Sequence, residues 1–153
     1  MAMYKIKQYI FVLLWIFANF SCFFAEKEIL CELAAFIENP DGSNAFLIDS
    51  GQASKELKSC DEENQKKCIQ VVENHVIEGT QRGNFSLSLD REEYTIGDVL
   101  CDKADAVEEN VRNKMVQIYW RLCGSKWART SFKMPEPLCC EDGLYVPCKK
   151  ITS

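Results

Sequence analysis

The stretch DVLCDKADAVEENVRNKMVQIYWRLC, from Asp98 to Cys123, has the clearest periodic pattern in this chain of 153 residues. Its apolar side chains recur three or four positions apart, the spacing of one face of an amphipathic α-helix. They are Leu100, Ala104, Val107, Val111, Met115, Ile118 and Leu122. Thr95 or Asp98 suits the N-cap, and Gly124 suits the end. The pattern predicts one helix from Asp98 to Cys123.

Two cysteines lie near the ends of this predicted helix. Cys101 and Cys123 are 22 residues apart, which in a helix corresponds to about 33 Å along the axis, too far for a disulfide. Each therefore needs a partner elsewhere in the chain. We expect the helix to be the element to which the rest of the molecule is tethered.

The N-terminus has the pattern of a secretory signal peptide over residues 1–25. Lys5 and Lys7 precede YIFVLLWIFANFSCFFA, an uncharged apolar run from Tyr9 to Ala25. A retained membrane anchor is the alternative, because a run of about 17 residues lies at the short limit for spanning a bilayer. We expect secretion, with no membrane insertion after cleavage. Residues 26–153 then form a single disulfide-stabilised extracellular domain.

Acidic residues outnumber basic ones in this predicted domain. Residues 26–153 contain 16 Lys and Arg against 23 Asp and Glu, a net charge of −7. An acidic surface repels nucleic acid and anionic membranes, so we expect neither as the main partner. The partner expected is an unknown extracellular protein or matrix component.

The sequence predicts no catalytic residues and no cofactor. A Gly-x-Ser-x-Gly elbow, a His-Glu-x-x-His pair, a P-loop and a dinucleotide-binding fingerprint are all absent. The single histidine, His75, has no assignable nucleophile partner, and a packed or surface role is the more frequent one for such a side chain. We therefore expect a protein that is not an enzyme.

Eight cysteines follow the predicted signal peptide. An even number in a secreted chain predicts four disulfides, with the connectivity left open. A metal site is not expected, because the chain has no Cys-x-x-Cys pair and one histidine only. The predicted disulfide cysteines are Cys31, Cys60, Cys68, Cys101, Cys123, Cys139, Cys140 and Cys148.

A turn signal near the start of the predicted domain indicates a β-hairpin. Pro40, Asp41 and Gly42 lie between ILCELAAFI, at Ile29–Ile37, and AFLI, at Ala45–Ile48. The odd-numbered residues of the first strand would share one face. A helix over residues 29–38 is the alternative.

Two more elements complete the predicted fold. After a polar loop over residues 49–64, the apolar spacing predicts a second helix from about Glu62 to Glu78. Near the end, Asp142-Gly143 indicates a C-terminal hairpin. Because neighbouring strand residues face opposite sides, Cys139 and Cys140 are predicted to reach separate partners in the helices or the N-terminal hairpin. The fold class is α+β, a small disulfide-rich domain with two main helices and short N- and C-terminal β-hairpins.

The connection over residues 80–97 contains the N-glycosylation sequon Asn84–Ser86, which makes Asn84 the predicted glycosylation site. The nearby carboxylates Asp90, Glu92 and Glu93 do not follow the order of a calcium-binding loop, so a solvated loop is expected there.

Three aromatic residues near the C-terminal hairpin have two interpretations. Trp127, Phe132 and Tyr145 would form an interaction patch or part of the core, and aromatic residues beside disulfides more often belong to the core.

The C-terminal part of the chain resembles the insect follicle cell proteins, a family of small secreted cysteine-rich proteins. The similar segments are IYWRLC at Ile118–Cys123, the spacer at Lys126–Thr130 and PLCCEDGLYVPC at Pro137–Cys148. Ser59–Val76 is similar to the family's cysteine-anchored middle helix. The chain departs from the family pattern in two places, where Cys31 and Cys68 each stand where the family has two cysteines.

The resemblance implies a function but no catalytic residues. It implies a secreted, non-enzymatic structural or binding component, related to the eggshell or another matrix. The alternative is a salivary or venom effector secreted into another organism. A small-ligand carrier fits less well, because the cysteine spacing of insect odorant-binding proteins is absent.

Overall fold

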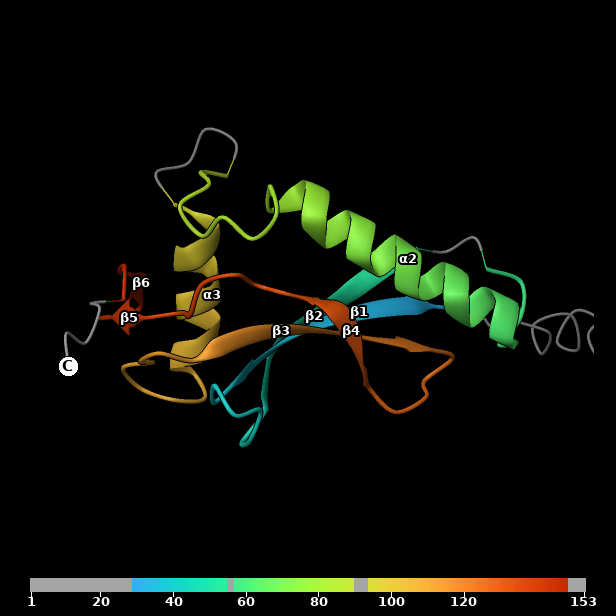
Figure 1. Ribbon diagram of the computed structural model, residues 1–153, viewed down its shortest axis with the longest axis horizontal. Coiled ribbons are helices and arrows are strands. Elements are labelled where there is room, and N and C mark those ends of the chain that lie inside the picture. Colours follow the sequence, from blue (N-terminus) through green and yellow to red (C-terminus); the bar gives the residue numbers. More distant parts are fainter. Residues whose placement is uncertain (1–28, 55–56, 90–93, 149–153) are drawn as a thin grey trace, which may run out of the picture.

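The computed structural model describes residues 29–54, 57–89 and 94–148 (Figure 1). The predicted signal peptide and the carboxylates Asp90, Glu92 and Glu93 lie outside the described residues. Among the helices of the described residues, none combines the length and apolarity needed to cross a bilayer.

The described chain forms a four-stranded antiparallel sheet, a two-stranded sheet and two helices. The strand order in the larger sheet is β2-β1-β3-β4, and α2 packs across these four strands (Figure 1). Along the chain the elements are β1 (Cys31–Glu38), β2 (Phe46–Ser54), α2 (Glu62–Gly79), α3 (Ile96–Asp105), β3 (Met115–Leu122), β4 (Ala128–Lys133), β5 (Cys140–Glu141) and β6 (Leu144–Tyr145).

The long helix predicted from Asp98 to Cys123 is wrong. Helix α3 ends at Asp105, and residues 115–122 form strand β3 instead. Between the two elements Asn110 and Asn113 have φ values of 56° and 54°, a left-handed conformation that interrupts a right-handed helix.

The misleading pattern has a physical reason. Met115, Ile118 and Leu122 fit helical spacing, but Val116, Ile118, Trp120 and Leu122 fit the alternation of a strand equally well. β-Branched and aromatic side chains pack well on a pleated surface, and β3 pairs with all eight residues of β1. Pairing with β1, which is distant in sequence, therefore favoured the two-residue period of a strand over the 3.6-residue period of a helix.

The predicted N-terminal hairpin is present, but its second strand is longer than expected. β1 and β2 pair in antiparallel register around a turn in which Gly42 has a φ of +80°. β2 continues to Ser54, so the loop predicted over residues 49–64 is wrong in its first part. The polar residues of this segment suggested a loop, but β2 is the edge strand of the sheet, where polar side chains remain in contact with solvent.

The two helices begin with capping groups that the sequence indicates. Asp61 caps α2, which begins at Glu62 and ends at Gly79 as predicted to within a residue. Thr95 and Asp98 form a reciprocal capping box at the start of α3. Both helices contribute to the same apolar core.

This core lies between the helices and one face of the larger sheet. Strands β1 and β3 contribute their alternate residues, and the helices contribute the apolar side that faces them. Buried members include Cys31, Ala35, Ile37, Cys68, Val72, Val76, Cys101, Ala104, Val116, Ile118 and Leu122.

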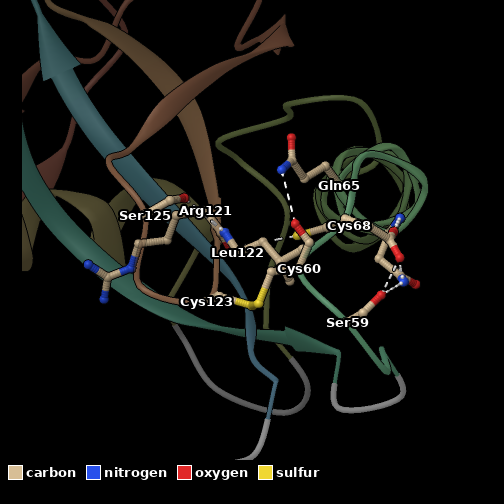
Figure 2. The surroundings of a disulfide bond; sticks show 10 residues. Ser59, Cys60, Gln65, Cys68, Arg121, Leu122, Cys123 and Ser125 are labelled. Atoms are coloured by element: carbon tan, nitrogen blue, oxygen red, sulfur yellow. Dashed lines mark hydrogen bonds between the residues drawn. A yellow bond between two sulfur atoms is a disulfide. The ribbon is translucent and has the colours of Figure 1, made fainter.

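All eight predicted cysteines form disulfides, which confirms the expected four bonds. Two connect α2 and its N-terminal approach to the sheet, and two hold α3 and the C-terminal segment. The bonds are Cys31–Cys68, Cys60–Cys123, Cys101–Cys140 and Cys139–Cys148. Figure 2 shows Cys60 bonded to Cys123 beside α2, where Gln65 Nε2 donates to the Cys60 carbonyl at 3.2 Å.

The C-terminal hairpin is present as β5 and β6, with Asp142 and Gly143 in its turn. Its adjacent cysteines have separate partners, as predicted. Cys140 reaches α3, but Cys139 bonds to Cys148 only nine residues away. The expectation that both would reach back to distant elements is therefore wrong for Cys139.

Candidate functional site

Strand alternation gives the larger sheet two different faces. Residues of β1 and β3 that lie directly opposite each other share a face, and the pair Glu32 and Arg121 lies on the side away from the core. Figure 2 shows the Arg121 side chain extending away from α2. We call this side the open face, and define it by Glu32, Phe36, Glu38, Tyr119, Arg121, Trp127 and Arg129.

One end of the open face is an ion pair covered by an aromatic ring. Arg121 donates from Nε and Nη2 to the two carboxylate oxygens of Glu32, at 2.8 and 2.7 Å. Its guanidinium carbon lies 4.2 Å from the centroid of the Trp127 ring, in cation–π contact. The bond to Glu32 raises the pKa of Arg121. The two-pronged geometry and the ring together hold the guanidinium in one orientation.

The other end is a second arginine that crosses three strands. Arg129, on β4, donates from Nε to the Tyr119 hydroxyl at 2.7 Å and from Nη2 to Glu38 at 2.6 Å. Nη2 also donates to the Gly42 carbonyl in the β1–β2 turn at 3.1 Å. The hydrogen bond to Tyr119, and after it the negative charge of Glu38, raise the pKa of Arg129. The Glu38 side chain is only 7% exposed, and a buried carboxylate needs an opposite charge beside it. The Arg129 guanidinium supplies that charge.

Phe36 joins the two ends. Its ring centroid lies 4.3 Å from that of Tyr119 and 6.3 Å from that of Trp127. All three aromatic side chains are partly exposed. The open face is thus a continuous layer of aromatic rings flanked by two arginine–glutamate pairs.

A buried irregularity between β3 and β4 sets the path of β4. Gln117 pairs with Lys133, but Tyr119 pairs with Arg129, so one β3 residue lies opposite three residues of β4. The Gln117 amide fills the interruption by donating to the Thr130 and Phe132 carbonyls at 3.3 and 2.9 Å. Such bulges re-aim neighbouring side chains. Here the bulge brings Arg129 opposite Tyr119.

The structure separates the three aromatic residues singled out in the sequence. Trp127 lies on the open face, whereas Phe132 and Tyr145 pack against the core. His75 is exposed on α2, and Asn84 is exposed after α2. The sequence patterns did not identify Tyr119 and Arg121, because assigning residues 115–122 to a helix hid their strand alternation.

The open face offers side chains that make non-covalent contacts. Among the described residues, His, Cys, Asp and Glu side chains nowhere gather in groups of three that would hold a metal ion. The open face presents flat apolar rings, guanidinium groups and carboxylates, all held by one another.

Comparison of the chain with protein-family models, curated proteins and solved structures finds no match. The resemblance to insect follicle cell proteins therefore stays a prediction. The open face is therefore described from the contacts of its residues and not from a related protein.

Proposed function

We propose that this protein is a secreted, non-enzymatic extracellular component that binds a protein partner through the open face of its sheet. The observation that carries the proposal is the layer of Phe36, Tyr119 and Trp127 held between the two arginine–glutamate pairs. The resemblance to insect follicle cell proteins supports a place in an extracellular matrix, such as the covering of an egg.

The composition of the open face supports a protein partner. Aromatic residues and arginine are enriched in protein interfaces, and tryptophan, tyrosine and arginine are the commonest residues on which binding depends strongly. The open face of the larger sheet carries four residues of these types, Tyr119, Arg121, Trp127 and Arg129.

The order of these side chains also supports binding. Immobilising a flexible side chain costs about 0.5–1.5 kcal/mol on association. Both guanidinium groups are already held by hydrogen bonds and rings before any partner arrives. Each charge has an opposite charge beside it, so an acidic partner meets less repulsion here than the net charge of the chain implies.

The four disulfides support an extracellular role. Disulfides persist in oxidising compartments and stabilise small domains there. When the protein is made in a eukaryotic secretory pathway, we expect it in the medium with no cysteine open to alkylation. Labelling of two or more cysteines without prior reduction would contradict this.

The binding site can be tested by photo-crosslinking on the secreted protein. A photo-reactive phenylalanine analogue replaces Phe36 in one variant and Lys66 in the control, because Lys66 lies on the exposed side of α2. Material from the tissue that secretes the protein should give a crosslinked product of one defined mass at position 36, lost with Arg121→Glu. Equal products at both positions would contradict the proposal.

The tissue itself tests the matrix role. An antibody on sections should stain follicle cells and the egg covering. Staining confined to the lumen of a salivary or venom gland would contradict the matrix role and favour an effector, with the open face as its candidate target-binding surface.

A further inference from the structure

The turn that follows α2 is shaped by three consecutive left-handed residues. Gln81, Arg82 and Gly83 have φ values of 46°, 68° and 90°. A Cβ at Gly83 would lie 2.5 Å from Pro135 Cδ, so glycine is required by both its conformation and its surroundings. The close approach holds this turn against the segment that follows β4.

The two segments enclose a shallow hollow of about 220 Å³ on the surface. Gln81, Arg82 and Glu136 offer an amide, a guanidinium and a carboxylate there, and Pro135 offers an apolar ring. This mixture suits a sugar ring, which has hydroxyl groups at its edge and C–H groups on its faces. Asn84 is part of the lining and is exposed.

The sequon itself is held in a fixed shape. Asn84 Oδ1 accepts a hydrogen bond from the Ser86 N–H at 3.0 Å. Between them Phe85 is 2% exposed and packs its ring 5.5 Å from that of Tyr145. Anchoring by Phe85 keeps Asn84 at the rim of the hollow.

We propose that Asn84 carries an N-linked glycan whose first sugar lies in this hollow. The site rests on the proposed secretion, because the donor is a lipid-pyrophosphate-linked oligosaccharide of the secretory pathway. The Asn84 Nδ2 bonds to the anomeric carbon, the bond from that carbon to the pyrophosphate oxygen breaks, and the amide proton passes to the transferase. The lipid pyrophosphate leaves, with no change of oxidation state.

The position of the glycan deepens the proposed function. Figure 1 shows the segment that follows α2, residues 80–89, on the side of the sheet that carries α2. The open face lies on the other side, so the glycan leaves it accessible. The sugar shields the helix side from proteins and directs partners to the open face.

The first experiment measures the mass of the full chain secreted from eukaryotic cells. We expect a glycan mass that an amidase removes, that Asn84→Gln and Ser86→Ala abolish, and that Ser86→Thr retains. Secreted protein with the bare polypeptide mass would overturn the glycan while leaving the proposed secretion intact. Protein retained in the cytosol with free thiols would overturn the proposed secretion and the glycan with it.

The second experiment tests where the first sugar lies. Trimming with an endoglycosidase that leaves one N-acetylglucosamine should preserve the Tm, whereas complete removal should lower it by a few degrees. The double variant Arg82→Ala/Glu136→Ala should remove that difference, and Lys66→Ala should keep it. An unchanged Tm after complete removal, or an equal loss in the double variant, would overturn the placement in the hollow.

Discussion

The two faces of the larger sheet use the same strands for different purposes. On the helix side, Ile37 of β1, Ile118 of β3 and Val72 of α2 belong to one apolar core, and a disulfide joins Cys31 to Cys68. On the open face, the alternate residues Glu32 and Arg121 are paired with each other. A sheet with one buried face usually leaves solvated side chains on the other. Here the second face is also ordered, by hydrogen bonds and ring contacts, and this order supports the proposed binding role.

The largest difference should appear when one of the two disulfides that join α2 and its N-terminal approach to the sheet is removed. Cys31→Ser/Cys68→Ser opens a bond with a sequence separation of 37. The loop-entropy model puts its contribution to the free energy of unfolding at about 4 kcal/mol, and Cys139→Ser/Cys148→Ser should lose about 2.5 kcal/mol. Urea unfolding of the two variants measures both. A larger loss for the second variant would show that the C-terminal segment, and not the helix side, limits stability.

The core and the open face should then differ in their response to a large-to-small substitution. Ile37→Ala leaves a cavity in the fully buried core and should cost about 2–4 kcal/mol. Its neighbour Phe36 is partly exposed, so Phe36→Ala should cost about half as much. It should also remove crosslinking to the partner from a photo-reactive residue placed at Trp127, whose ring centroid lies 6.3 Å from that of Phe36. Urea unfolding gives the stabilities and the crosslinking yield gives binding. Equal stability losses would contradict the two-sided description.

The ion pair on the open face should contribute little to folding. A double-mutant cycle on Glu32→Ala and Arg121→Ala should give a coupling energy of about 0.5–1 kcal/mol, because both side chains are partly exposed. Arg121→Ala should nevertheless abolish partner binding. Thermal unfolding and crosslinking measure the two effects. A coupling of several kcal/mol would assign the pair a structural role instead.

The smallest effect is expected on stability at acidic pH, through the hydrogen bond by which Asp98 of α3 holds β6. Burial raises the pKa of Asp98, but hydrogen bonds from Thr95 and from the Tyr145 N–H outweigh it and leave the pKa below its ordinary value of 3.8. The stability that Asp98 contributes is therefore present above pH 3.8 and is lost as the pH falls through the lower folded pKa. Asp98→Asn should flatten this part of the stability curve measured between pH 5 and 2. An unchanged curve would show that other carboxylates govern acid unfolding.

Local signals in the sequence predicted several elements well. The turn at Pro40–Gly42, the N-cap at Asp61 and the box at Thr95 depend on side chains a few residues from the backbone groups that they satisfy. Helix α2 was also predicted from local sequence, because the spacing of its apolar residues fits a helix and not a strand. These elements are decided within about twenty residues, so the sequence displays them directly.

The open face was not predicted, and the reason is the ambiguity of residues 115–122. Tyr119 and Arg121 look like polar positions of a helix until β3 is known to pair with β1. Phe36 gains its neighbours only through that pairing, and Gln117 gains its partners only through the bulge in β4. No local pattern marks contacts between residues about 80 positions apart.

The sequence by itself determined the four-disulfide chemistry, helix α2, the turns of both hairpins and the start of α3, because short-range capping, turn and cysteine-count rules suffice for each. Only the tertiary structure decided which cysteines pair, that residues 115–122 form a strand, and that Arg121 and Arg129 meet their glutamates on one face. The physical reason is that antiparallel pairing of β1 with β3 joins segments far apart in the chain, and its hydrogen bonds and shared core outweighed the local helical pattern.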